Sequence, residues 1–222
     1  GVQRAFDSYR DHPNVVVLAS GVSDSTVTDV AQFEREETLL AKTLEEQRGK
    51  RFVYFGTCSA VDPELSVSPY VRHKLKMEKV IETHSVDYLI FRLPQAVGHN
   101  GNTNTLINRL YASIRNGQRF QLWRNAYRYI IGVDDVSAVA SYMIGQNEYS
   151  SRIINVASRR FSIFDIVQAL ENVTQRSAIY DEIDKGASYD IDCYEAHRIA
   201  GLRNIRFDDT YLHRVISKYY AA

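Results

Sequence analysis

Tyr70 and Lys74 are the pair in this 222-residue sequence whose types and spacing most directly suggest chemistry. They open a helix-like segment after Ser68 and Pro69, and four residues are about one helical turn, so the phenol and the ammonium would share a face. A free tyrosine has a pKa of about 10, and a neighbouring cation lowers that pKa by favouring the phenolate. We expect this pair to act as a general acid/base; the alternative is an ordinary pair on a helix surface.

A second candidate, Thr57, follows the apolar residues 52–55, which predict a buried strand. The hydroxyls of Thr57 and Ser59 would then lie at the carboxyl end of this strand, the edge at which open α/β sheets bind ligands. The loop between Thr57 and Tyr70 is long enough to bring the helix back beside the strand. Thr57 would hold the reacting oxygen of a substrate while Tyr70 moves the proton; the alternative is that residues 56–59 only form a turn.

The elements that must position these residues alternate along the chain. Short, β-branched apolar runs predict strands at residues 15–18, 52–55, 88–91, 129–133 and 153–156. Apolar residues at helical spacing predict helices at 33–47, 70–84, 105–116 and 134–145, and further helices are expected after Ser162 and near 209–219. This alternation predicts an α/β fold, a Rossmann-like, doubly wound parallel sheet covered on both faces.

Composition argues against several classes of protein. The 27 basic residues balance the 27 acidic ones, so no overall charge draws the chain to nucleic acid or to an anionic membrane. No apolar run approaches the roughly 20 residues of a membrane-spanning helix, and residues 1–12 lack a signal-peptide core, so we expect a soluble, cytoplasmic protein. Cys58 and Cys193 lack metal-ligand spacing, which predicts two reduced thiols and no metal site.

Four ordered blocks resemble the extended short-chain dehydrogenases/reductases, the NAD-dependent sugar-nucleotide epimerases and dehydratases. The blocks are residues 51–63, 68–78, 91–98 and 128–136, within a resemblance that spans residues 15–157. The resemblance implies that Thr57 takes the place of the catalytic Ser/Thr and Tyr70 that of the acid/base. Lys74 takes the place of the lysine that also holds the nicotinamide ribose, and the implied cofactor is NAD or NADP.

The same resemblance implies further binding residues. Those near the cofactor are Ala19, Ser20 and Gly21 after the first predicted strand, together with Leu93 and Pro94. Those near the sugar nucleotide are Ser59, Gln95 where the family usually has Asn, Arg128 at the diphosphate, and Phe120 and Leu122 near the base. A planar guanidinium suits a diphosphate well. Trp123 belongs to the same segment near the base, residues 120–123, but could equally be a core residue.

The sequence departs from the family in two places. The glycine-rich turn that lets the family's backbone approach the pyrophosphate does not precede the first predicted strand; Gly1 could be its last glycine, with residues 2–9 as the first helix. Either an N-terminal piece is missing from this chain, or the chain is a compact, atypical, N-terminally shortened member. No residue that would select between NAD and NADP is found. Cys58 and Ser59 follow Thr57 where dehydratases of this kind have an Asp-Glu pair, which favours epimerisation or keto reduction over dehydration.

These features favour an NAD(P)-dependent oxidoreductase or epimerase acting on a nucleotide-diphosphate sugar, in polysaccharide or related biosynthesis. The alternative is a non-catalytic binding relative with a degenerate cofactor site. Either is compatible with a homodimer that pairs through the helices at 33–47 and 70–84. We expect residues 1–157 to form the cofactor-binding core, with 95–128 contributing to the substrate cleft, and residues 158–222 to form a small substrate-binding lobe.

Overall fold

A four-stranded parallel sheet organises the fold in a computed structural model, which describes residues 2–62, 65–99, 102–186 and 188–221. Its strand order is β1-β2-β3-β7. The strands are β1 (Val15–Leu18), β2 (Arg51–Thr57), β3 (Tyr88–Leu93) and β7 (Arg152–Asn155). All seven residues of β2 are buried, as a near-continuous apolar run predicts for a central parallel strand. The predicted α/β class is confirmed.

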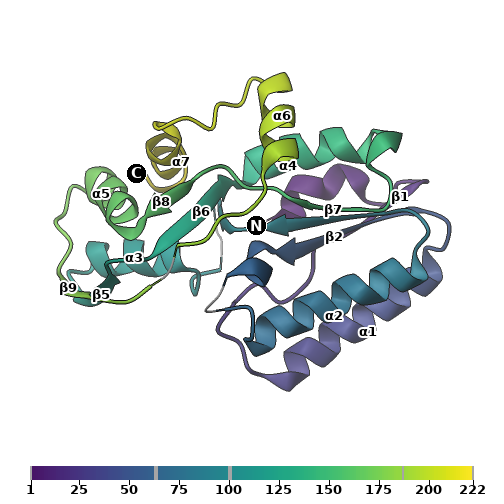
Figure 1. The fold of residues 1–222 in the computed structure, drawn as a ribbon, viewed down its shortest axis with the longest axis horizontal. Helices are drawn as coiled ribbons and strands as arrows, with labels where there is room; N and C mark the ends of the chain where they lie inside the picture. The colour runs from purple at the N-terminus through teal and green to yellow at the C-terminus, as the bar shows by residue number, and fades with distance from the viewer. Residues whose placement is uncertain (1, 63–64, 100–101, 187, 222) are drawn as a thin grey trace.

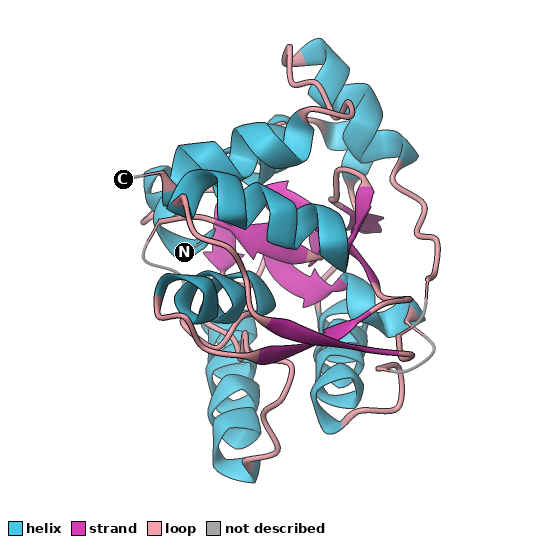
Figure 2. Cartoon of the chain, turned by 90° about the vertical axis from the view of Figure 1, so that its left-hand side faces the viewer, coloured by secondary structure: helices cyan, strands magenta, loops and turns pink. Residues whose placement is uncertain are grey.

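Helices cover both faces of this sheet because successive strand residues point to opposite sides (Figures 1 and 2). Phe52 and Tyr54 pack towards α1 (Val30–Glu46) and α2 (Pro69–His84). Val53 and Phe55 belong to the cluster on the other face, which includes α4 (Val133–Ile144) and α6 (Tyr194–Leu202). The short 3-10 helix η1 (Val2–Tyr9) also packs on that face through Phe6.

A second group of elements lies beside the main sheet, at the left of Figure 1. Its strands form two small sheets, β4-β6-β8 and β5-β9. The bounds are β4 (Gln95–Val97), β5 (Phe120–Trp123), β6 (Tyr127–Gly132), β8 (Arg160–Ser162) and β9 (Tyr180–Ile183). The helices α3 (Leu106–Arg115), α5 (Ile163–Thr174) and α7 (Tyr211–Tyr220) supply a second apolar core.

The α5 helix begins where the sequence predicts it. The Ser162 hydroxyl accepts a hydrogen bond from the Asp165 backbone N–H, and the Asp165 carboxylate accepts one from the Ser162 N–H. This reciprocal capping box satisfies two donors that a helix start would otherwise leave without partners. The remaining short elements are the 3-10 helices η2 (Cys58–Val61) and η3 (Asn147–Tyr149).

The first strand, β1, forms one edge of the parallel sheet as far as the described residues extend. Gly1, expected to close a glycine-rich turn, lies outside the described residues, and residues 2–9 form a 3-10 helix kinked at Phe6 where one regular helix was expected. Within the part of the chain that the structure describes, no helix is both long and apolar enough to cross a bilayer.

Candidate active site

Thr57 ends the buried strand β2 and lies at the carboxyl edge of the sheet. It pairs in register with Leu93, the last residue of β3, so the two side chains belong to the same edge. Thr57 is also the N-cap of η2, and its hydroxyl oxygen accepts a hydrogen bond from the Ser59 N–H at 3.1 Å. This contact fixes the hydroxyl at the place where ligands bind in open α/β sheets.

Tyr70 reaches the same edge from the first turn of α2. Ser68 caps this helix by accepting a hydrogen bond from the Val71 N–H at 3.2 Å, and Pro69 at the first helical position has no N–H that needs a partner. The Thr57 side chain hydrogen-bonds the Tyr70 phenol. The structure therefore brings together the hydroxyl and the phenol that the sequence places on separate elements.

The sequence predicts that Lys74 lowers the pKa of Tyr70, and this prediction is wrong. The Lys74 ammonium lies 2.8 Å from Oε1 of Glu36 and 3.0 Å from the Tyr54 hydroxyl. Burial raises the pKa of Tyr70 to about 12, and the hydrogen bond with Thr57 opposes that rise without overcoming it. Tyr70 is consequently a neutral phenol at pH 7.

The residues predicted to lie near the cofactor follow β1 and β3, and one of them, Gly21, packs against an ion pair. Ala19, Ser20 and Gly21 follow β1 at the same edge as Thr57, and Leu93 and Pro94 follow β3. A Cβ at position 21 would lie 2.2 Å from Glu36 Oε1 and 2.6 Å from the Lys74 ammonium. Gly21 therefore makes room for this ion pair, and a role in holding a cofactor stays a prediction.

The residues expected near the sugar nucleotide divide into two groups. Ser59 is part of η2 beside Thr57, and Gln95 in β4 pairs in register with Ile130 of β6. Arg128, also in β6, lies close enough to Tyr189 to affect the pKa of its phenol, as do Asp62 and Cys58. Ser59, Gln95 and Arg128 thus belong to the elements around the carboxyl edge of the sheet.

Phe120 and Leu122 lie elsewhere, in the β5-β9 sheet that Figure 1 shows beyond β6, away from β2. The Leu122 side chain is completely buried in the second core. Any contact of Leu122 with a ligand would therefore have to be made by its backbone. Phe120 packs against Tyr180, and Trp123, which could have been core filler, is 38% exposed.

Two residues at this edge escape the sequence reading. Glu36 occupies the inward face of α1, four residues before the buried Leu40, so a carboxylate at an apolar position was the available signal. Tyr189, in the irregular segment before α6, hydrogen-bonds the Asp62 side chain, and burial is the main reason that its pKa is raised. No local sequence pattern marks the contact between Tyr189 and Asp62, because these residues are far apart in the chain.

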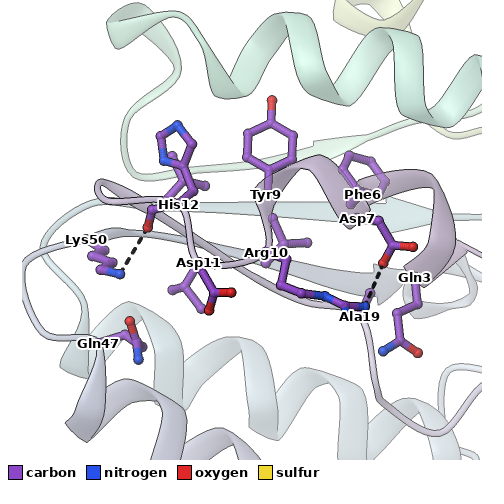
Figure 3. Close-up of a pocket in the computed structure, with 13 residues that line it drawn as sticks. Gln3, Phe6, Asp7, Tyr9, Arg10, Asp11, His12, Ala19, Gln47 and Lys50 are labelled. Atoms are coloured by element: carbon purple, nitrogen blue, oxygen red, sulfur yellow. Dashed lines mark hydrogen bonds and ion pairs between the residues drawn. The ribbon is translucent and has the colours of Figure 1, made fainter.

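A hollow of about 400 Å³ runs along the outer edge of β1 (Figure 3). Gln3, Asp7 and Arg10 of the N-terminal segment line it, facing Gln47 and Lys50. Ala19 is the one expected cofactor residue among those that line this hollow. Thr57 and Tyr70 are not in its lining, so it is separate from the candidate catalytic pair.

A family model, described as "NAD dependent epimerase/dehydratase family", matches residues 2–157. No curated protein sequence matches the chain closely enough to count as a relative.

Solved structures share the fold at low sequence identity. UDP-glucose 4-epimerase from Thermus thermophilus, in complex with NAD, is 13% identical with a TM-score of 0.69, over 99% of this chain and 80% of that one. UDP-glucose 4-epimerase from Thermotoga maritima, with UDP-glucose, is 17% identical with a TM-score of 0.68, over 89% and 73%. UDP-N-acetylglucosamine 4-epimerase from Bacillus cereus is 18% identical with a TM-score of 0.71, over 98% and 79%.

Proposed function

Since the chain belongs to the NAD-dependent epimerase/dehydratase family, we propose that it is an NAD(P)-dependent epimerase or keto reductase acting on a nucleotide-diphosphate sugar. The observation that carries this proposal is the contact between Thr57 and Tyr70 at the carboxyl edge of a parallel sheet. The solved structures that share the fold include complexes with NAD and with UDP-sugars, which favours the same ligand classes here.

The residues at this edge suit such a cofactor in part. The ends of β1, β2 and β3 lie in register at one edge, and Lys74 supplies an ammonium that can donate hydrogen bonds to ribose hydroxyls. A bound nicotinamide would supply or accept a hydride. Tyr70 and Lys74 would lie towards the nicotinamide ribose, with Ala19, Ser20, Leu93 and Pro94 around it.

Tyr70 would move the proton that accompanies hydride transfer, and its neutral form defines the first step that it can assist. A neutral phenol donates a proton, so Tyr70 would protonate the oxygen of a keto group. Thr57 would hold that oxygen beside the phenol. This observation favours keto reduction, or the reductive half of an epimerisation, as the step in which Tyr70 acts directly.

Gln95 and Arg128 would bind the sugar nucleotide, Arg128 through its planar guanidinium at the diphosphate. Cys58 and Ser59 supply no carboxylate pair next to Thr57, which favours epimerisation or reduction over loss of water.

Ligand-dependent thermal unfolding tests the proposal. A ligand present at about 100 times its Kd stabilises the folded state by about 2.7 kcal/mol, which for a chain of this size corresponds to a rise in Tm of several degrees. We expect NAD(H) or NADP(H) to raise the Tm, and a sugar nucleotide from a panel of UDP, dTDP, GDP and CDP sugars to raise it further. No rise with any dinucleotide at millimolar concentration would contradict the proposal.

A further inference from the structure

Glu36 is a buried carboxylate for which the proposed reaction has no direct use. It lies on α1 with 1% of its surface exposed. Four donors converge on it, and they come from three different parts of the fold. An ionised carboxylate is costly to bury unless it is fully hydrogen-bonded and paired with a cation, so this convergence indicates a specific role.

The four contacts join the loop after β1, the strand β2 and the helix α2. The Val22 backbone N–H donates to Oε2 at 2.8 Å, and the Tyr54 hydroxyl donates to Oε1 at 2.6 Å. From α2, His73 Nε2 lies 3.0 Å from Oε2, and the Lys74 ammonium lies 2.8 Å from Oε1. The absent side chain of Gly21 leaves the space that this arrangement needs.

Lys74 is as deeply buried as its partner, with 3% of its surface exposed. Burial lowers the pKa of Lys74, and the charge and hydrogen bond of Glu36 are the main influences that oppose this. Glu78 on the same helix acts in the same direction more weakly, and the Tyr54 hydroxyl accepts a hydrogen bond from the ammonium. Glu36 of α1 is therefore the main group that favours the charged form of this buried lysine.

We propose that Glu36 is a positioning residue of this site, which keeps Lys74 charged and holds its ammonium between α1 and the loop after β1. The proposal rests on the proposed function, because it assigns Glu36 the task of presenting Lys74 to a bound cofactor as an ammonium ion. Without Glu36, burial acts on Lys74 without that opposing charge and hydrogen bond, so Lys74 becomes a neutral amine at a lower pH. A neutral amine carries no charge to attract the cofactor or to stabilise a phenolate formed at Tyr70.

Titration of Lys74 by NMR in ¹⁵N-lysine-labelled protein tests this directly, with the Lys74 signal assigned by its loss in Lys74→Met. We expect Glu36→Gln to lower the pKa of Lys74, because it removes the charge that opposes the effect of burial. Glu36→Asp, which keeps the charge, should recover most of the difference. Glu37→Gln removes a neighbouring carboxylate that contacts His73 and Lys76 and should leave Lys74 unchanged.

An unchanged Lys74 pKa in Glu36→Gln would overturn the proposal. If Glu36→Gln does not fold, the double variant Glu36→Gln/Lys74→Met decides, since it removes both buried charges. Folding of the double variant supports the proposal, because it shows that the unpaired Lys74 was the cause; failure of the double variant overturns it.

Cofactor affinity supplies a second readout. With Glu36→Gln we expect the affinity for NAD(H) or NADP(H) to fall about tenfold over the pH range in which the NMR titration shows Lys74 losing its proton, while the unmodified protein keeps its affinity over that range. Absence of cofactor binding by the unmodified protein would instead contradict the proposed function. The lysine titration needs no ligand, so the two failures are distinguishable.

Discussion

At the scale of single residues, the central feature is a phenol held neutral beside a threonine. The sequence identifies Tyr70, Lys74 and Thr57, and the contact between Thr57 and Tyr70 agrees with it. The raised pKa of Tyr70 could not be predicted, because its main cause is burial and because Glu36, a residue 34 positions earlier, binds the Lys74 ammonium. Spacing along one helix shows which side chains share a face and does not show which partner each of them binds.

Thr57→Val should lower turnover by about 10²–10³, the usual cost of removing a preorganised donor from a reacting oxygen. Thr57→Ser keeps the hydroxyl and should stay within about tenfold of the unmodified protein. Steady-state kinetics with the sugar nucleotide found by thermal unfolding checks both. Equal activity of the Val and Ser variants would mean that the Thr57 hydroxyl takes no part in the reaction.

The stability of the protein should depend on acid through Glu36. The hydrogen bond from His73 and the charge of Lys74 outweigh burial and hold the pKa of Glu36 at about 2, below its usual value of 4.5. A lowered pKa in the folded state means that stability is present above pH 4.5 and is lost as the pH falls towards 2. Urea unfolding between pH 6 and pH 3 should therefore show a steeper loss for the unmodified protein than for Glu36→Gln. Parallel curves would contradict this.

At the scale of elements, the sequence predicts the alternating part of the fold closely. The strand predicted at residues 15–18 is β1, and the helix predicted at 70–84 is α2 apart from its first residue. The helix α6 and the strands β4, β5, β8 and β9 escape prediction, and β8 and β9 show why. Each of the two strands is short and half exposed, and its pairing partner, β6 or β5, is distant in the chain, so no local periodicity reveals it.

The capping box of α5 provides a test at this scale. Ser162→Ala removes the hydroxyl that accepts the Asp165 N–H, and should lower the free energy of unfolding by about 1 kcal/mol. Thr105→Ala is the matched control, because Thr105 is the N-cap of α3 and its side chain makes no capping hydrogen bond. Urea unfolding measures both losses of stability from the shift of the midpoint, provided that the slope m of the free energy against urea concentration is unchanged. Equal losses in the two variants would mean that the capping contact does not stabilise α5.

At the scale of the whole molecule, Tyr211 joins the second core to the end of β6. It is 2% exposed, its hydroxyl donates to Asp135 Oδ2 at 2.5 Å, and it accepts a hydrogen bond from the Gly132 N–H at 2.9 Å. Three elements, α7, β6 and α4, therefore meet at one hydroxyl. The sequence gives no sign of this contact, because the residues that make it are about 80 positions apart.

Tyr211→Phe should lower the free energy of unfolding by about 1–3 kcal/mol, since it leaves the buried Gly132 N–H without its acceptor. Tyr219→Phe is the control on the same helix, where the corresponding bond from the Asp134 N–H is exposed and the loss should be smaller. Chemical unfolding compares the two variants. A larger loss for Tyr219→Phe would contradict this account of how the two cores are joined.

Whether Tyr70 moves the proton in a nicotinamide-dependent reaction is tested most directly by comparing Tyr70→Phe with the unmodified protein in two assays. One assay measures the rise in Tm with the dinucleotide and the sugar nucleotide, and the other follows conversion of that sugar nucleotide by NMR. We predict that Tyr70→Phe keeps the rise in Tm and loses about 10²–10⁴ in turnover. Turnover that survives unchanged in Tyr70→Phe would contradict the account.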